Sequence, residues 1–435
     1  MEELVRNTEM DKSGYYSKLQ NKSRVNLFNY LITPYLFFLL FGPKIGLYFD
    51  TSIIASLFTV IIVLSQKKNI VFYKNYFSYV VGILIILMYS FFMMLLNDNI
   101  LVVLVGRYLR SIISLISIWT IFAASKKSNE AIIYSLIKVL AIHAFLVIVT
   151  AFNLELQHML SLFTGFDKKI RPLRSTGLMI GFDMAGLLCV LGYILSSAFP
   201  YKTTKKINLR IMMILFMGGT LVTSRFSILI LLVILFLFII KNRKNKNKKF
   251  EVRLGIIFIS IIAVPVLLLF LATTSIGGNL QNTLSNYFPH FNSVVNGFMD
   301  SYADTNIEST FLNHFNFDGL SLTNIIFGIA ANVNQDPGYT TTIYSIGIIG
   351  LTLSMIWYLK VFVDTFRVKN QLIKQKYNFR EINYINQIIV IMILITFGLS
   401  IKNNYFFTGT YFEILVIFIS LLYRKITKER CSNET

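Results

Sequence analysis

The chain has 435 residues, of which 55% are hydrophobic and only 14% are charged. No water-soluble fold of this size hides so many apolar side chains, so the composition excludes a soluble domain. The formal charge of +20 would suit nucleic acid, but Lys and Arg gather in short loops between apolar runs, which is the orientation signal of membrane proteins. The two cysteines are too few for a disulfide framework or a Cys-rich metal site.

Apolar runs of about 20 residues recur along the chain, and each is long enough to cross about 30 Å of hydrocarbon. They predict an all-α, polytopic membrane protein with about 12 transmembrane helices. The run 211–240 is divided in two because Thr223, Ser224 and Arg225 interrupt it. The expected spans are residues 25–42, 45–65, 76–96, 100–124, 131–152, 178–199, 211–223, 226–240, 254–273, 340–361, 385–401 and 405–423.

The first two dozen residues are polar and mixed in charge, unlike a cleavable signal peptide, so both termini are expected in the cytoplasm. The strongly basic connectors then fall inside with one exception, and residues 254–359, which contain no Lys or Arg, hold the main external loop. Aromatic residues in that loop argue against disorder and for short helices at the membrane surface. The expected divisions are a cytoplasmic segment 1–24, spans one to nine within 25–273 with an external loop 153–177, a large external loop 274–339, spans ten to twelve within 340–423, and a cytoplasmic tail 424–435.

The external loop 153–177 is the exception to this charge rule. It holds Lys168, Lys169, Arg171 and Arg174 within seven residues, on the side where basic residues should be scarce. Arginine forks match phosphate oxygens and stay ionised, so Arg171 and Arg174 are candidate ligands of a diphosphate or another anionic headgroup. The alternative is that they contact the phosphates of ordinary lipids.

Three further arginines are expected near the outer membrane boundary. Arg225 lies between two short spans, where an ionisable residue marks a site by default. Arg107 and Arg110 are three residues apart on one helical face and fit the same description. For these two, an ion pair with Asp183 or a lipid contact is the alternative to substrate binding.

The candidate bases are few. His143 is expected to be a satisfied core residue, whereas His314 in the large loop is a candidate general base. Asp336 precedes a span and sits beside Pro337 in a predicted turn, where it could accept a proton from a sugar hydroxyl or simply cap the next helix. No histidine pair has the spacing of metal ligands, so we expect neither a metal nor a cofactor.

Several short patches occur in an order typical of one family. Asn324 to Gly328 (Asn-Ile-Ile-Phe-Gly), Asp336 to Tyr339 (Asp-Pro-Gly-Tyr) and Gly347 to Gly350 (Gly-Ile-Ile-Gly) follow one another, with Arg174 to Gly177 (Arg-Ser-Thr-Gly) and Thr223 to Arg225 (Thr-Ser-Arg) upstream. Together they resemble the large-loop end, the Arg-x-x-Gly segment and the Ser-Arg signature of bacterial polysaccharide polymerases and the related O-antigen ligases.

That resemblance implies roles for particular residues. Arginines of the family are thought to hold the diphosphate of an undecaprenyl-linked glycan, which implies Arg171, Arg174 and Arg225 as phosphate ligands here. Asp336 occupies the position of the histidine with which the ligases activate the acceptor hydroxyl. Tyr339 matches the tyrosine three residues further on and is expected to bind substrate.

The sequence therefore leads us to expect a metal-independent glycosyltransferase that polymerises undecaprenyl-diphosphate-linked repeat units into capsular polysaccharide, exopolysaccharide or O-antigen. It would act at the outer face of the bacterial cytoplasmic membrane. Expected partners are that lipid-linked oligosaccharide, the bilayer, and a flippase and chain-length regulator of the same pathway, with no nucleic acid. The alternatives are a flippase of lipid-linked oligosaccharides, which lacks chemistry, and an O-antigen-type ligase.

Overall fold

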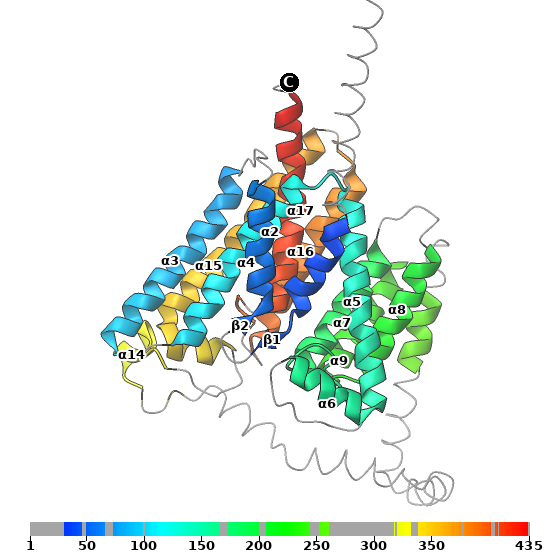
Figure 1. Ribbon diagram of the computed structural model, residues 1–435, viewed down its shortest axis with the longest axis horizontal. Coiled ribbons are helices and arrows are strands. Elements are labelled where there is room, and N and C mark those ends of the chain that lie inside the picture. The colour runs from blue at the N-terminus through cyan, green and yellow to red at the C-terminus, as the bar shows by residue number, and fades with distance from the viewer. Residues whose placement is uncertain are drawn as a thin grey trace, which may run out of the picture. The chain divides into compact units, whose positions relative to one another are not determined.

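The computed structural model describes residues 30–45, 49–65, 73–98, 101–164, 173–199, 206–242, 252–260, 317, 320–331, 338–375, 377–401, 405–407 and 409–433 (Figure 1). It divides the chain into two compact units. The first unit, Met1–Thr223 with Leu320–Thr435, holds most of the described helices, and the second is Ser224–Gly319.

Helices make up almost all the regular structure within these ranges. The elements of the first unit are the helix Tyr30–Phe41, β1 (Lys44–Ile45), β2 (Phe49–Asp50), α2 (Thr51–Ser65), α3 (Lys74–Leu96), α4 (Val102–Ala124), α5 (Asn129–Phe152), α6 (Leu154–Phe163), α7 (Phe182–Ala198), α8 (Lys206–Leu221), α14 (Leu322–Phe327), α15 (Gly338–Lys374), α16 (Phe379–Leu399) and α17 (Gly409–Asn433). The second unit contributes α9 (Arg225–Asn242) and a helical segment at 252–260. Within the described residues, α3, α4, α5, α15 and α16 are five helices long and apolar enough to cross a membrane. The chain is therefore a multi-pass helical membrane protein.

The prediction of a span at 45–65 is wrong at its start. Lys44–Ile45 pairs with Phe49–Asp50 in an antiparallel ladder, and α2 begins only at Thr51. Both the backbone N–H and the hydroxyl of Thr51 donate to the carbonyl of Pro43, at 3.3 and 2.6 Å. These bonds close the hairpin on the helix start, and the apolar run that suggested a longer helix simply continues through the hairpin.

Other helix ends differ from the prediction in both directions. α15 continues to Lys374 rather than 361, and α17 continues to Asn433, so that most of the predicted tail 424–435 extends this helix. The helix α6 lies in the predicted loop 153–177 and was not expected. The short helix α14 confirms that the region 274–339 carries helical structure, although only residues 317, 320–331, 338 and 339 of that region are described.

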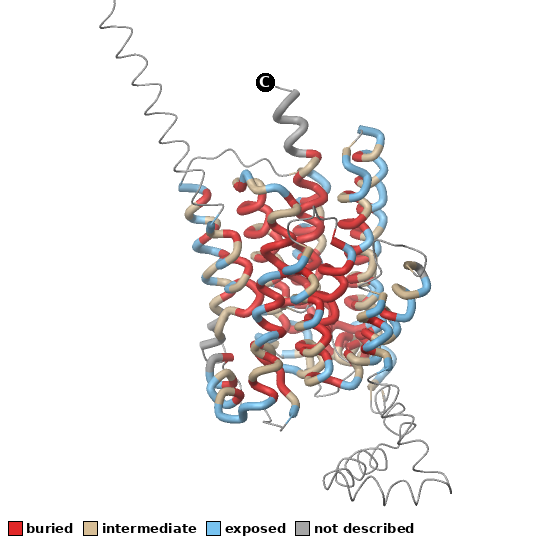
Figure 2. Tube along the Cα trace, turned by 90° about the vertical axis from the view of Figure 1, so that its right-hand side faces the viewer, coloured by how far each residue is buried: buried red, intermediate tan, exposed pale blue. Residues whose placement is uncertain are grey.

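The helix α17 forms the centre of the first unit. It packs against α4, α15 and α16, and every side chain from Thr410 to Arg424 is buried. Figure 2 shows this helix, which ends at the marked C-terminus, in the colour of buried residues over most of its length. α3, in contrast, buries Tyr76 and Ile83 on one face and exposes Met88 (63%) and Phe92 (56%) on the other. In a membrane protein such exposed apolar faces contact lipid.

The first unit has two distinct ends. Figure 1 shows α6 and α14 at one end and the C-terminal end of α17 at the other. We call the first the α6–α14 end. The second, which carries Lys360, Arg367, Arg424 and Lys425, we call the basic end.

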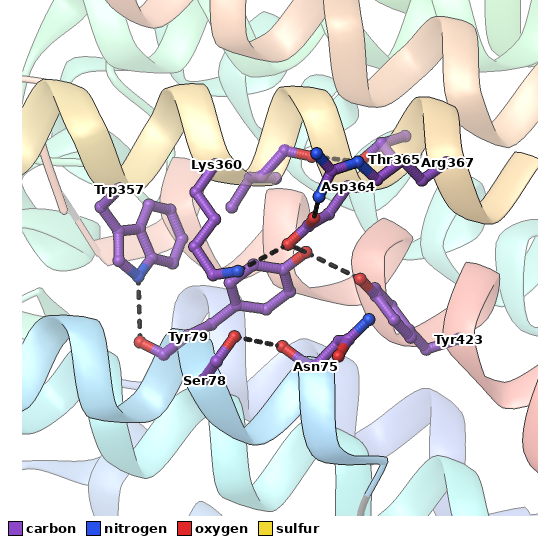
Figure 3. Close-up of polar contacts among 10 residues, drawn as sticks. Asn75, Ser78, Tyr79, Trp357, Lys360, Asp364, Thr365, Arg367 and Tyr423 are labelled. Atoms are coloured by element: carbon purple, nitrogen blue, oxygen red, sulfur yellow. Dashed lines mark hydrogen bonds and ion pairs between the residues drawn. The ribbon is translucent and has the colours of Figure 1, made fainter.

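A buried carboxylate joins three helices at the basic end (Figure 3). Asp364 of α15 accepts hydrogen bonds from the Nζ atom of Lys360 at 2.8 Å and from Arg367 at 3.4 Å. The hydroxyl of Tyr79 in α3 donates to the same carboxylate at 3.3 Å, and Tyr423 of α17 lies 2.9 Å from that hydroxyl. Lys360, Arg367 and Tyr79 all donate to Asp364, and Tyr423 joins them through Tyr79, so the arrangement stabilises the contact of α3, α15 and α17.

Hydrogen bonds from Arg424 also hold α17 against the loop before α5 at the basic end. The buried guanidinium of Arg424 donates to the carbonyl of Ser125 and to Oδ1 of Asn129 at 3.3 Å. Lys127 lies in the same loop, and partial burial, together with the nearby charge of Lys138, lowers the pKa of its ammonium group. Positively charged side chains of α17, of α5 and of the loop before α5 thus lie close together at the basic end.

Candidate functional site

An ion pair between α4 and α17 lies at the α6–α14 end. Nε of Arg110 is 2.9 Å from Oε1 of Glu413, and the hydroxyl of Ser114 donates to the same oxygen at 3.3 Å. Arg110 and Ser114 are four residues apart, so both face Glu413 from one side of α4. The Glu413 side chain is only 1% exposed and that of Arg110 is 17% exposed. Because a buried carboxylate is costly unless it is paired, this pair fixes the orientation of the guanidinium group.

Arg110 also lines a pocket of about 150 Å³. The walls come from the end of the helix Tyr30–Phe41, from the turn before α7 at Met179, and from the start of α17 at Gly409. A Cβ atom at Gly409 would lie 3.3 Å from the guanidinium carbon of Arg110, so the glycine leaves room beside the charge. A small pocket that presents an oriented guanidinium group is suited to an anion.

Arg107 lies one helical turn before Arg110 on the same face of α4 and is half-buried. Among the residues that the structure describes, its guanidinium group has no hydrogen-bond or ion-pair partner. Three residues of helix advance about 4.5 Å along the axis. An anion beside Arg110 would therefore have a second positive charge within one turn.

The segment Arg174 to Gly177 contacts the end of α8. Nε of Arg174 donates to the carbonyl of Thr223 at 3.0 Å, and the backbone N–H of Ser175 donates to the carbonyl of Val222 at 2.9 Å. The guanidinium carbon also lies 4.6 Å above the ring of Phe182. Two sequence patches that are about fifty residues apart, and that were predicted to belong to one site, thus meet in the first unit.

Gly177 fixes the path of this segment. Its φ of +50° lies in the left-handed region, and a Cβ atom there would approach the ring of His143 at 3.2 Å. His143 is fully buried and stacks on Phe41 with ring centroids 4.8 Å apart. Its Nε2 atom lies 3.4 Å from the carbonyl of Ala185, so the expectation of a core residue is confirmed.

The glycines of two further patches bring their backbones into close contact. Gly328 (φ +89°) follows α14 and Gly347 (φ +67°) interrupts α15, and a Cβ atom on Gly328 would lie 2.5 Å from the backbone nitrogen of Gly347. The N–H of Ile329 donates to the carbonyl of Tyr344 at 2.9 Å, and the hydroxyl of Ser345 donates to the carbonyl of Ala331 at 3.2 Å. Contact between bare backbones explains why both positions are glycine.

Tyr339 packs and hydrogen-bonds against the end of α16 and the segment that follows it. Its hydroxyl donates to the carbonyl of Phe397 at 2.8 Å, its N–H donates to the carbonyl of Ser400 at 3.2 Å, and its ring packs against Phe406. These bonds anchor the start of α15 against the end of α16. The tyrosine therefore holds the chain immediately after Asp336 in place.

The remaining predicted site residues lie either outside the described residues or in the second unit. Asp336, His314 and Arg171 lie outside the described residues. Arg225 is the first residue of α9, is exposed, and belongs to the second unit. Among the described residues, no group of three or more His, Cys, Asp or Glu side chains lies close enough together to hold a metal ion.

The structure adds one residue that sequence reasoning missed, Glu413. A single carboxylate within an apolar run was a signal for it, because an ionisable residue inside a membrane segment marks a site by default. Asp364, which lies beyond the predicted end of a span at 361, is a second buried carboxylate, but there the Lys360, Arg367 and Tyr79 donors all converge on the carboxylate. The Arg110 pair differs because its guanidinium group faces a pocket.

No family model matches the sequence, and no curated protein sequence matches it at a significant level.

Proposed function

We propose that the protein is a membrane glycosyltransferase that joins undecaprenyl-diphosphate-linked repeat units into a cell-envelope polysaccharide. The observation that carries the proposal is the pairwise meeting of distant segments, Arg174 with Thr223 and Gly328 with Gly347. These are the segments on which the resemblance to polysaccharide polymerases and O-antigen ligases rests. Both pairs lie in the first unit, and the pocket beside Arg110 lies at the same α6–α14 end.

The proposal includes a topology of about 12 spans with both termini in the cytoplasm. The charge distribution supports this orientation, because basic residues gather at the end that would face the cytoplasm. The α6–α14 end would then face outward, and the region 274–339 would form the large external loop. The chemistry would take place at the outer face of a bacterial cytoplasmic membrane.

The proposed reaction is a glycosyl transfer. A sugar hydroxyl of the acceptor unit attacks the anomeric carbon of the donor glycan, and the bond from that carbon to the diphosphate oxygen breaks. The hydroxyl proton passes to Asp336 or His314, a new glycosidic bond forms, and undecaprenyl diphosphate leaves. Guanidinium groups stabilise the charge that develops on the departing diphosphate. The candidates are Arg107 and Arg110 in α4, with Arg171, Arg174 and Arg225 from the sequence patches.

The test is the size of the polysaccharide made by a deletion strain that is complemented with variants. We choose Arg107→Ala because this side chain has no hydrogen-bond or ion-pair partner among the described residues, so its loss should not disturb the fold. Arg380→Ala, which removes an exposed guanidinium group at the start of α16, is the matched control. Asp336→Asn tests the base. Each variant must reach the membrane at the wild-type level.

A polymerase that uses Arg107 would leave single repeat units on the outer face in the deletion strain and in Arg107→Ala, with normal polymer in Arg380→Ala. Repeat units that accumulate on the inner face of the deletion strain would instead identify a flippase. Normal polymer that is not joined to its final acceptor would identify a ligase.

A further inference from the structure

The last four turns of α15 carry a row of exposed basic side chains at the basic end. Lys360, Arg367 and Lys374 are all exposed and follow one another at intervals of seven residues. Seven residues make two helical turns, so the three charges lie on one face of α15, about 10 Å apart along the axis. Val363 and Phe366, each 37% exposed, lie between the first two charges. We call these five residues the basic face.

The charge of this face is only partly offset. Asp364 bonds Lys360 at 2.8 Å and Arg367 at 3.4 Å, yet the two basic side chains remain 42% and 76% exposed (Figure 3). One carboxylate beside three cations leaves the face positive. Glu381 on the neighbouring helix α16 is already bonded to Lys425 at 2.6 Å. The basic face therefore suits an acidic occupant from elsewhere.

The length of the row favours a peptide over lipid headgroups as that occupant. From Lys360 to Lys374 the helix advances about 21 Å along its axis. The headgroup region on each side of a bilayer is only about 5–8 Å deep. Under the proposed topology Lys360 lies near the membrane boundary, so Lys374 lies beyond the reach of the headgroups. A partner that pairs with the whole row must extend along the helix.

The chain itself contains an acidic segment of the matching pattern. Its first eleven residues, which lie outside the described residues, hold the four acids Glu2, Glu3, Glu9 and Asp11 and one cation, Arg6. On a helix, Glu2, Val5 and Glu9 would share one face at the spacing i, i+3, i+7. Two cations of the basic face and the valine between them have the same spacing.

The connection to the described chain is long enough for this contact. Gly42, which follows the helix Tyr30–Phe41, lines the pocket at Arg110, so Tyr30 lies at the other end of that helix, toward the basic end. The eighteen residues 12–29 can span up to about 60 Å. Tethering also gives a segment an effective concentration of about 1 mM, so exposed ion pairs that are weak individually can hold it.

From this match we infer that residues 2–11 bind along the basic face of α15 as a short helix. Glu2 and Glu9 lie beside the cations of the face, and Val5 lies against Val363 and Phe366. The contact ties the N-terminal segment to the helix that begins beside Asp336. It requires the N-terminus at the basic end but does not depend on the proposed chemistry.

The experiment places the photoreactive residue p-benzoylphenylalanine at position 5 of the full-length protein. The nanodiscs contain equal amounts of phosphatidylcholine and phosphatidylglycerol, so anionic headgroups compete for the basic face. Cross-linked peptides are identified by mass spectrometry. A mixture of isotopically heavy and light protein separates a contact within one chain from a contact between two copies.

Charge reversals test the pairing. One variant carries Glu2→Lys and Glu9→Lys, a second carries Arg367→Glu and Lys374→Glu, and a third combines all four changes. Either reversal alone replaces attraction by repulsion, so we expect cross-links to residues 360–374 to fall about tenfold, equivalent to ~1.4 kcal/mol. The fourfold variant should recover them, because the opposite charges face each other again.

The matched control reverses Lys74 and Lys126, two exposed cations at the same end but outside the basic face, and should cross-link as the wild type does. Thermal midpoints establish that each variant is folded. If the double reversal in α15 does not fold, Lys374→Glu alone, at the last residue of the helix, takes its place. Cross-links only to lipid or only between copies, cross-links to α15 that persist in both reversals, or no recovery in the fourfold variant would each overturn the inference.

Discussion

The contact between Gly328 and Gly347 allows a sharp test of the fold around Asp336. We consider Gly347→Ala. The backbone of Gly347 has φ +67° and ψ −179°, a region that is essentially restricted to glycine and costs other residues about 1–3 kcal/mol. A Cβ atom there would also overlap the backbone of Ile326, Phe327 and Gly328, approaching the nitrogen of Gly328 to 2.6 Å.

Backbone atoms cannot rotate away as a flexible side chain can, so relief requires α14 to move away from α15. That movement would break the bond from Ile329 to Tyr344, worth about 1 kcal/mol. It would also lengthen the contact of Ser345 with Ala331, which adds little because the single hydroxyl proton of Ser345 lies closer to the carbonyl of Thr341, at 2.7 Å. The expected loss of stability is therefore about 2–4 kcal/mol, the sum of the backbone cost and the lost hydrogen bond.

The matched control is Gly398→Ala in α16. A Cβ atom on Gly398 has no neighbour within 4 Å, and Gly398 lies in the last turn of α16, where alanine gains less than the ~1 kcal/mol by which it is favoured over glycine in a helix interior. Thermal unfolding in detergent should place Gly347→Ala clearly below the wild type and Gly398→Ala at or above it. Polymer length in cells should fall for Gly347→Ala alone, because the displaced segment leads to Asp336. The reasoning fails if the two alanine variants unfold at the same temperature.

Two further predictions compare the buried carboxylates. Glu413→Gln should cost about 3 kcal/mol or more, because it leaves the largely buried charge of Arg110 without its counterion; a thermal midpoint equal to that of the wild type would contradict a buried pair. Asp364→Asn should cost only about 1 kcal/mol, because Lys360 and Arg367 are 42% and 76% exposed and remain solvated. The order of the two midpoints in one detergent checks both, and the reverse order would count against the burial argument.

Hydropathy alone placed most helices well, and the errors have specific causes. An apolar run reports which residues avoid water but not where the backbone turns, so the prediction extended the helix at 51–65 back through the β1–β2 hairpin. Gly46 and Asp50, which lie inside the predicted span 45–65, were the available signals of a break. α6 could also have been found, since the side chain of Asn153 caps it by accepting a bond from the N–H of Leu156 at 3.0 Å.

The candidate site was predictable in part for a related reason. Short patches such as Arg174 to Gly177 and Gly347 to Gly350 indicated candidate segments of a site, but only the fold brings Arg174 to the carbonyl of Thr223. No spacing in the sequence reports that α17 lies beside α4, so the partner of Arg110 could not be chosen among the carboxylates. The sequence likewise gave no sign that the hydroxyl of Tyr339 donates to the carbonyl of Phe397, and the predicted substrate contact of Tyr339 stays a prediction.

Under the proposed function, the charges around the pocket at Arg110 limit which residues can bind a diphosphate there. Arg110 and Glu413 form a pair with no net charge, so their attraction for an anion is directional rather than strong. A diphosphate carries more than one negative charge, and binding it next to Glu413 requires further positive charge to offset the repulsion from that carboxylate. Arg107, one turn away on the same face of α4, is the nearest source along the helix. Under the proposed function, Arg110 would therefore orient the phosphate and Arg107 would supply the net attraction, and for this reason we expect Arg107→Ala to impair polymerisation without disturbing the fold.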